Sequence, residues 1–260
     1  MNYQDIHFEL RGDHSEVAVI RLARTAKRNA LSDGLILALR DIFEQMPASV
    51  RAAVIDGEGP HFCAGLDLSE LRERDAGQGL HHSRMWHAAL DRVQYGPVPV
   101  IAALHGAVVG GGLELASACH IRVADASTFY ALPEGSRGIF VGGGGAVRIP
   151  KLIGVARMTD MMLTGRVYDA QEGERVGLAQ YLVPEGQAFD KALELALRVA
   201  QNAPLTNYAL MHALPRIAEQ PADQGLFTEA MMAAIAQSAP EAKQRLADFL
   251  EGRAAKVRKN

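Results

Sequence analysis

The chain has 260 residues with 27 basic and 30 acidic side chains, and its formal net charge of −3 gives no reason to expect nucleic-acid binding. Its hydrophobic share of 48% argues against disorder, and two cysteines are too few for a disulfide scaffold. The N-terminal residues lack the pattern of a signal peptide, and the longest uncharged stretch, 95–113, contains prolines and glycines unsuited to a membrane span. We therefore expect a globular cytoplasmic protein without a membrane partner.

Strand-like and helix-like patterns alternate along the first ninety residues. Residues 17–22 and 50–56 are dense in β-branched and aliphatic residues, which predicts two buried strands. Between them, Ser32 and Asp33 offer an N-cap for a helix that runs to about Met46. The sequence also allows helices over 65–74 and 82–93.

A second round of strand, glycine cluster and helix begins at residue 98. The predicted strands cover 98–104, 120–124 and 128–131, and the predicted helices cover 111–119 and 146–153. Beyond Val155 the pattern is mostly helical, with capping signals at Asp169, Glu185 and Pro240. Because no low-complexity linker interrupts the chain, we predict one main α/β domain over 1–195 and a helical region over 196–260.

Common nucleotide, nucleophile and metal motifs are missing from the sequence. The glycine clusters complete neither a dinucleotide fingerprint nor a phosphate loop, and no GxSxG elbow occurs. His81, His82 and His87 do not form HExxH, and there is no CxxC, so we expect no metal site. A solvated helix start explains these histidines more simply than a ligand role.

Three stretches carry the functional signal. They are residues 61–68 (HFCAGLDL), 105–116 (HGAVVGGGLELA), and 132–134 (LPE) followed by Gly138 and 142–145. In this order and spacing they closely resemble the crotonase (enoyl-CoA hydratase/isomerase) superfamily, and the resemblance extends from Asn29 to Glu251. It implies an α/β, crotonase-like spiral of repeated ββα units, with a C-terminal helical region that builds a homotrimer or a dimer of trimers.

The resemblance places an oxyanion hole at the backbone N–H groups of Ala64 and Gly111. Gly111 would open a helix, so its N–H would be free and reinforced by the positive end of the helix dipole. Two such donors suit a thioester carbonyl whose oxygen becomes enolate-like. Without the combined motif, turns and tight helix packing would explain these glycines equally well.

Two glutamates are the predicted catalytic residues. Glu114 lies among apolar residues near the start of the predicted helix, and Glu134 follows Pro133. Burial raises the pKa of a carboxyl group toward the range of a general acid. In the hydratases that the sequence resembles, glutamates at both positions hold a water and exchange its protons during addition to a carbon–carbon double bond. Alternatively, they are a helix-start charge and a surface turn residue.

The resemblance also implies a coenzyme A (CoA) site. Lys27, Arg28 and Ala30 resemble a segment that contacts the CoA nucleotide, where basic side chains suit its phosphates. The further substrate positions are Ala64, Gly65, Leu66, Asp67, Gly111 and Gly142. Phe249, Arg253 and Lys256 resemble a C-terminal region that approaches CoA, although a charged tail is commonly just solvated. Met85 and Trp86 are candidates for walls of the acyl pocket, or for the core.

Three positions depart from the common family pattern. Val141 stands where many members have proline, and His120 stands where many have aspartate. Arg137, after Glu134, could face solvent or alter the acyl pocket. These departures leave the fold prediction intact and bear on the reaction.

The predicted reaction is reversible addition of water to a trans-2-enoyl-CoA, with CoA as part of the substrate and no other cofactor. Double-bond isomerisation, retro-aldol cleavage and thioester hydrolysis use the same oxyanion hole and stay open, as does non-catalytic acyl-CoA binding. The sequence does not specify the acyl chain. Apolar residues of the C-terminal third predict a subunit interface. They are Leu210, Met211, Leu214, Ile217, Leu226, Met231 and Met232.

Overall fold

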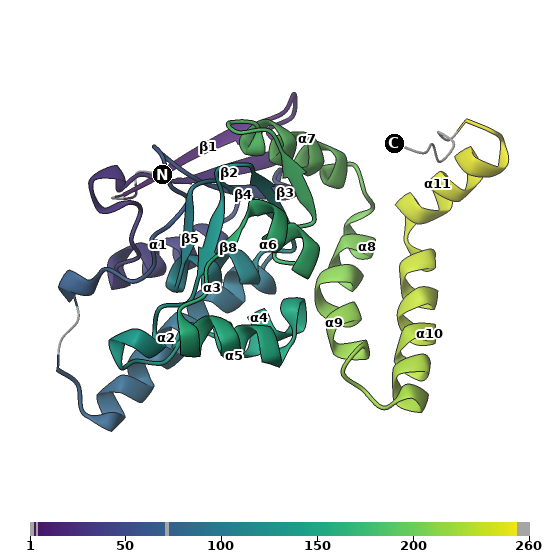
Figure 1. The fold of residues 1–260 in the computed structure, drawn as a ribbon. Coiled ribbons are helices and arrows are strands. Elements are labelled where there is room, and N and C mark those ends of the chain that lie inside the picture. The colour runs from purple at the N-terminus through teal and green to yellow at the C-terminus, as the bar shows by residue number, and fades with distance from the viewer. Residues whose placement is uncertain (1–2, 4, 71–72, 254–260) are drawn as a thin grey trace. The chain divides into compact units, whose positions relative to one another are not determined.

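The computed structural model describes residues 3, 5–70 and 73–253, which belong to two compact units, Met1–Ala200 and Gln201–Asn260. The first unit ends with helix α7 (Ala188–Ala200), drawn in green in Figure 1. Our sequence boundary after residue 195 falls inside this helix. Because Ala192, Leu195 and Ala196 all pack against strands of the main sheet, the whole of α7 belongs to the first unit.

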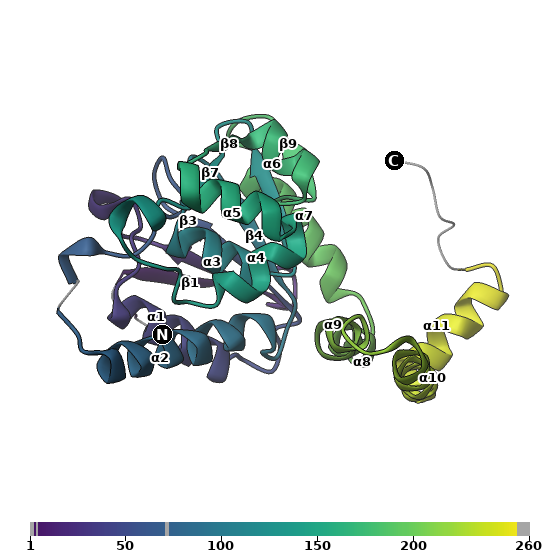
Figure 2. The same cartoon turned by 60° about the horizontal axis from the view of Figure 1, so that its bottom comes forward.

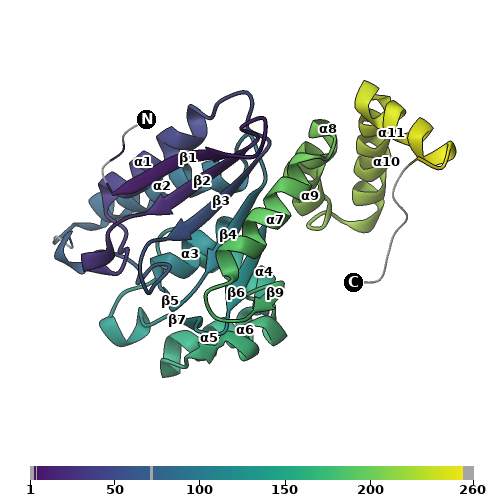
Figure 3. The ribbon, with the colours of Figure 1, turned by 90° about the horizontal axis from the view of Figure 1, so that it is seen from above.

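A six-stranded sheet forms the centre of the first unit, in the order β1-β2-β3-β4-β6-β9. Its strands are β1 (Ile6–Arg11), β2 (Val17–Leu22), β3 (Ala52–Gly57), β4 (Val100–Leu104), β6 (Ile121–Asp125) and β9 (Tyr181–Val183). Only the β1–β2 pair is antiparallel, and Figure 3 shows β1 to β4 side by side. The strand predicted over 17–22 is confirmed, and the one predicted over 50–56 begins two residues later.

Alternate residues of the central strands pack on opposite faces of this sheet. Ala18 and Ile20 face helices α1 (Asp33–Glu44), α2 (Ala76–Gln94) and α3 (Gly111–Ala118), whereas Val17 and Val19 face α7. Both faces are therefore covered, which explains why these strands are mostly apolar instead of alternating with polar residues. Helices α1 and α2 lie side by side in Figure 2.

A second, three-stranded sheet brings the three motif stretches together. Its order is β5-β7-β8, with β5 (Ala107–Val109), β7 (Phe129–Ala131) and β8 (Tyr168–Asp169). Cys63 pairs with Val108, and Leu66 pairs with Leu31, each through an isolated parallel bridge. The segment 61–68 is thus held between the turn after β2 and the start of α3.

Several helix boundaries in the structure differ from those that the sequence predicts. We predicted a helix over 65–74. The described part of this range contains only a 3₁₀ turn at Leu68–Glu70. Helix α2 begins at Ala76, six residues before the predicted start, because Asp75 and Gln78 form a capping box. Helix α7 begins at Ala188 and not directly after Glu185. Asp169 caps α6, as predicted.

The remaining helices of the first unit are α4 (Gly145–Ile153), α5 (Val155–Thr164) and α6 (Ala170–Val176). The second unit contains α8 (Pro204–Tyr208), a π-helical turn (Ala209–Ala213), α9 (Leu214–Ile217), α10 (Ala222–Ser238) and α11 (Pro240–Leu250). Large apolar side chains on α10 are exposed, including Leu226 and Phe227 at 67% and 70%. In the described part of the chain, no helix is long and apolar enough to span a membrane.

Candidate active site

A cavity of about 290 Å³ lies where α2, α3 and the glycine-rich loop before α4 meet. Residues from all three motif stretches line it. They include Leu66, Gly111, Glu114, Glu134, Gly142 and Gly143. The structure therefore brings together residues that are far apart in the sequence, including both predicted catalytic glutamates.

The turn into α3 requires glycine for conformational and steric reasons. Gly110 has φ +52° and ψ −120°, and its N–H donates to the Ala131 carbonyl at 2.9 Å. A Cβ on Gly112 would lie 2.4 Å from the Cys63 carbonyl oxygen. The backbone of 61–66 can approach the start of α3 only because no side chain stands between them.

Glu114 is held by the glycine-rich loop. The Gly143 and Gly145 N–H groups both donate to its Oε1 atom at 2.8 Å. The side chain is almost completely buried, and burial raises the pKa of Glu114, although these two hydrogen bonds and nearby Arg148 act in the opposite direction. One carboxyl oxygen is thereby fixed in a defined position on the cavity wall.

Glu134 occupies a different environment. Its Oε2 atom is buried and has no hydrogen-bond partner among the described residues. The carboxylate lies over the turn into α3, since a Cβ on Gly110 would come within 2.6 Å of Glu134 Oε1. Burial raises the pKa of Glu134, and the nearby Glu114 carboxylate raises it further. A buried carboxyl oxygen without a hydrogen-bond partner is costly in a folded protein, which makes Glu134 a candidate for a functional role.

The backbone donors differ from the sequence prediction at one position. The Ala64 N–H already donates to the Arg28 carbonyl at 3.0 Å, so it is not available to a ligand. The N–H groups of Leu66 and Gly111 have no acceptor within the described part of the chain. They lie close together, because a Cβ on Gly111 would be 3.4 Å from the Leu66 nitrogen. The available pair of donors is thus Leu66 and Gly111.

One face of α2 forms the opposite wall of the cavity. Its lining residues are Gly79, His82, Ser83 and Trp86, which follow the i, i+3, i+4, i+7 spacing of one helix face. Trp86 lines the cavity and also belongs to the buried core, whereas Met85 packs against the core and is not among the lining residues. His82 is no solvated residue at a helix start. The sequence could have indicated this position, because His82 and Trp86 are four residues apart and such residues share one helix face.

Hydrogen bonds from Asn29 stabilise the segment that the sequence resemblance assigns to CoA binding. Asn29 is fully buried, and its side-chain amide donates to the carbonyl oxygens of Glu58 and His61 at 2.9 and 2.7 Å. Lys27 is half-exposed and lies 3.8 Å from Asp67, while Arg28 is exposed and Ala30 is buried. These positions leave the two basic side chains accessible at the end of β2.

Asp67 has a bracing role in the structure. It accepts hydrogen bonds from Ser69 and from Arg24 Nη2, the latter at 2.9 Å. The Ser69 hydrogen bonds and the Arg24 guanidinium lower the pKa of Asp67 to about 2. These interactions stabilise the segment after Leu66. We therefore expect no direct contact between the Asp67 carboxylate and the substrate.

The remaining predicted positions have varied surroundings. Val141 lines the cavity and Arg137 is exposed. His120 accepts a hydrogen bond from the Val100 N–H at its Nδ1 atom, which is a structural role. Phe249 is 68% exposed on α11 in the second unit, and Lys256 lies outside the described residues.

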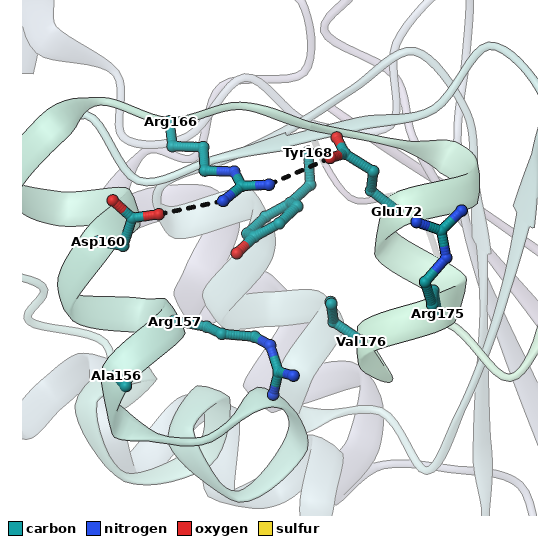
Figure 4. A pocket seen from close by; sticks show the side chains of 8 residues that line it. All are labelled: Ala156, Arg157, Asp160, Arg166, Tyr168, Glu172, Arg175 and Val176. Carbon is teal, nitrogen blue, oxygen red and sulfur yellow. Dashed lines mark hydrogen bonds and ion pairs between the residues drawn. The ribbon is translucent and has the colours of Figure 1, made fainter.

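A second cavity of about 290 Å³ lies between α5 and α6 (Figure 4). Arg166 pairs there with Asp160 and Glu172, and its guanidinium lies 4.6 Å from the centre of the Tyr168 ring. Because both carboxylates are engaged by Arg166, this cavity offers no unpaired base. None of the predicted site residues lines it. Among residues 3, 5–70 and 73–253, no cluster of His, Cys, Asp and Glu side chains could hold a metal ion.

Comparisons with known proteins agree with this site. The family model described as enoyl-CoA hydratase/isomerase matches residues 12–260. The 2,3-dehydroadipyl-CoA hydratase of Escherichia coli K12 is 32% identical over 241 residues, which cover 91% of this chain and 93% of that protein. A crystal structure from Rhodopseudomonas palustris CGA009 is 62% identical and superposes with a TM-score of 0.93 over 97% of each chain.

A crystal structure of enoyl-CoA hydratase from Bacillus anthracis is 33% identical and has a TM-score of 0.89, covering 97% of this chain and 98% of that one. The α/β fold of the first unit, with its paired sheets and surrounding helices, is thus the crotonase fold. The chain belongs to the enoyl-CoA hydratase/isomerase family and is an enzyme of the crotonase superfamily.

Proposed function

We propose that this enzyme adds water reversibly to the 2,3 double bond of a trans-2-enoyl-CoA thioester. The observation that carries the proposal is the placement of two buried glutamates, Glu114 and Glu134, in one cavity with two unpaired backbone N–H groups. Hydration needs a group that accepts a proton from water, a group that protonates carbon, and a site for the developing oxyanion.

The thioester oxygen accepts hydrogen bonds from the N–H groups of Leu66 and Gly111 in this mechanism. Gly111 is the first residue of α3, so its N–H is not needed by the helix and lies at the positive end of the helix dipole. As electron density moves onto the thioester oxygen, both bonds strengthen. A single donor of this kind contributes on the order of 3 kcal/mol in a water-excluded site.

The two glutamates have complementary tasks. Glu114, fixed by the Gly143 and Gly145 N–H groups, orients the water and takes its proton as the hydroxyl group adds to the β-carbon. Glu134 gives a proton to the α-carbon, which is consistent with the raised pKa that burial imposes on its carboxyl group. In the reverse direction Glu134 removes that proton. CoA takes part only as the carrier of the acyl group, with no additional cofactor.

Isomerisation of the double bond is the second candidate function. It needs one carboxylate to move a proton between two carbons, and Glu134 lines the cavity with an oxygen that has no hydrogen-bond partner among the described residues. Retro-aldol cleavage and thioester hydrolysis would use the same pair of donors. Glu114 separates hydration from isomerisation because hydration needs an oriented water and isomerisation does not.

The test compares Glu114→Gln and Glu134→Gln with the parent enzyme on a panel of enoyl-CoA substrates, with product identification by mass spectrometry. Each variant keeps its shape and loses the ionisable group, so kcat should fall at least about a hundredfold. Glu174→Gln, at an exposed position, is the matched control and should retain full activity. Full hydratase activity in either site variant would exclude the mechanism, and activity lost only in Glu134→Gln would favour isomerisation.

A further inference from the structure

One wall of the cavity carries polar and cationic side chains. Arg74, His82 and Ser83 line it together with Trp86, whereas Ile139 and Phe140 line it from the loop after Glu134. A pocket for a plain hydrocarbon chain needs only apolar walls, because each buried polar group without a partner has a free-energy cost. These three residues therefore bear on what the acyl chain contains.

Arg74 and His82 lie on the N-terminal side of Trp86. Trp86 marks the reacting end, since a Cβ on Gly111 would lie 3.5 Å and a Cβ on Gly143 would lie 3.2 Å from its ring. His82 precedes Trp86 by one helical turn, or about 6 Å along the helix axis. Arg74 lies just before the N-cap of the same helix. A chain of a few methylene groups from the thioester spans this interval.

The Arg74 guanidinium lacks a close acceptor. Its nearest anionic partner is Asp33 Oδ2 at 3.7 Å, and no hydrogen bond to it occurs among the described residues. The side chain is only 24% exposed. By contrast, the guanidinium of Arg148 makes three hydrogen bonds, two of them at 2.6 Å. A guanidinium has five donors in a planar fork that matches a carboxylate, so Arg74 has unused capacity for one.

Asp33 positions the neighbouring histidine. Its Oδ1 atom lies 2.7 Å from His82 Nε2 and accepts a hydrogen bond from Trp86 Nε1 at 3.0 Å. Burial acts to raise the pKa of Asp33, but these hydrogen bonds outweigh it and hold the pKa below its usual value. Asp33 does not line the cavity. The hydrogen bond with Asp33 therefore fixes the orientation of the His82 ring, which lines the cavity.

We propose that Arg74 binds a carboxylate at the far end of the acyl chain, so that the preferred substrates are enoyl-CoA monothioesters of dicarboxylic acids. This inference rests on the proposed function, because it assumes that an acyl-CoA thioester occupies the cavity. Arg74 supplies the charge and the planar pair of donors, and the His82 ring, held by Asp33, lines the same cavity. Ile139 and Phe140 contact the methylene groups between the thioester and the carboxylate.

The first experiment measures binding without turnover. Adipyl-CoA and hexanoyl-CoA are both saturated and differ only in the terminal group of the acyl chain. The ratio of their Kd values, measured by calorimetry, therefore reports how the cavity interacts with that terminal group. The parent enzyme should bind adipyl-CoA about 10- to 100-fold more tightly, as expected for a charge-assisted hydrogen-bonded pair. Arg74→Met should abolish this preference, and Arg74→Lys should retain part of it. Arg84→Met, on an exposed position of the same helix, is the matched control and should leave the preference unchanged.

Equal Kd values for the two ligands in the parent enzyme, or a preference unaffected by Arg74→Met, would overturn the carboxylate site. The second measurement, turnover of the corresponding trans-2-enoyl-CoA pair, separates this outcome from failure of the proposed function. Hydration of both substrates without discrimination would overturn the carboxylate site and leave hydration intact. Tight, Arg74-dependent binding of adipyl-CoA with no hydration would overturn the proposed function and support the carboxylate site.

Discussion

Arg148 is joined to Glu114 through the backbone of Gly143. Arg148 Nη1 donates to the Gly143 carbonyl at 3.1 Å, and the Gly143 N–H donates to Glu114 Oε1 at 2.8 Å. The same guanidinium donates to Gln94 and Asp91 on α2, each at 2.6 Å. Arg148 thus ties the glycine-rich loop to α2, and its positive charge acts to lower the pKa of Glu114.

Replacing Arg148 should therefore impair positioning of the water. In Arg148→Met we expect kcat to fall by about 10- to 100-fold with a smaller change in KM, because the loop that fixes Glu114 loses its anchor. Loss of the positive charge should also raise the pKa of Glu114 and shift the acidic limb of the kcat/KM profile to higher pH. Arg157→Met, on the neighbouring helix, is the control. A lower rate with an unshifted pH profile would mean that Arg148 only stabilises the fold.

Glu114 should reduce stability at neutral pH. Because burial raises its pKa in the folded state, the folded protein holds more protons than the unfolded chain once the pH exceeds the ordinary pKa of a glutamate side chain. Stability contributed by the protonated group is therefore present below that pH and is lost as pH rises through the folded-state pKa. Glutamine keeps an oxygen that accepts from Gly143 and Gly145 but carries no charge.

Glu114→Gln should consequently gain stability relative to the parent protein as pH rises from about 4 to 8. The measurement is thermal unfolding at each pH, in which about 1 kcal/mol corresponds to roughly 2–4 °C for a domain of this size. Glu174→Gln at its exposed position should show no such trend. A constant difference in Tm between parent and Glu114→Gln at all pH values would show that burial does not destabilise the Glu114 carboxylate.

The choice of oxyanion donor can be tested by replacing single amides with esters. An α-hydroxy acid in place of Leu66 removes its N–H and keeps the side chain, so kcat/KM should fall by about two to three orders of magnitude. The same replacement at Ala64 removes the bond to the Arg28 carbonyl, and its main effect should be on stability. Loss of activity only on replacement at Ala64 would contradict this assignment. It would favour the Ala64 N–H as the oxyanion donor, as the sequence resemblance implies.

Assembly is the fourth prediction. We propose a homotrimer or a dimer of trimers, because large apolar residues remain exposed both on α10 and on the α4–α5 region, where Val155 and Leu163 are 69% and 82% exposed. Light scattering should give three or six times the mass of the chain. Leu226→Glu combined with Phe227→Glu should dissociate the assembly, whereas Glu229→Gln on the same helix should not. A stable monomer in the parent protein would contradict the proposal.

The sequence by itself determined the fold class, and it predicted the two glutamates that line the cavity. Continuous apolar runs such as 17–22 predict strands buried on both faces, and the spacing of three glycine-bearing stretches identifies the family. Helix starts were predictable where a cap is local, as at Ser32 and Asp169, because the capping bond joins neighbouring residues. Such features depend on neighbouring residues and can therefore be predicted from short stretches of sequence.

Only the tertiary structure decided which groups are free to act. The Ala64 N–H is used because the left-handed turn at Arg28 and Asn29 brings the Arg28 carbonyl within 3.0 Å, which leaves Leu66 as the available donor. Arg74 and His82 line the cavity only because α2 packs against α3. Hydrogen-bond partners and cavity walls depend on segments far apart in the chain, and no pattern of neighbouring residues determines them.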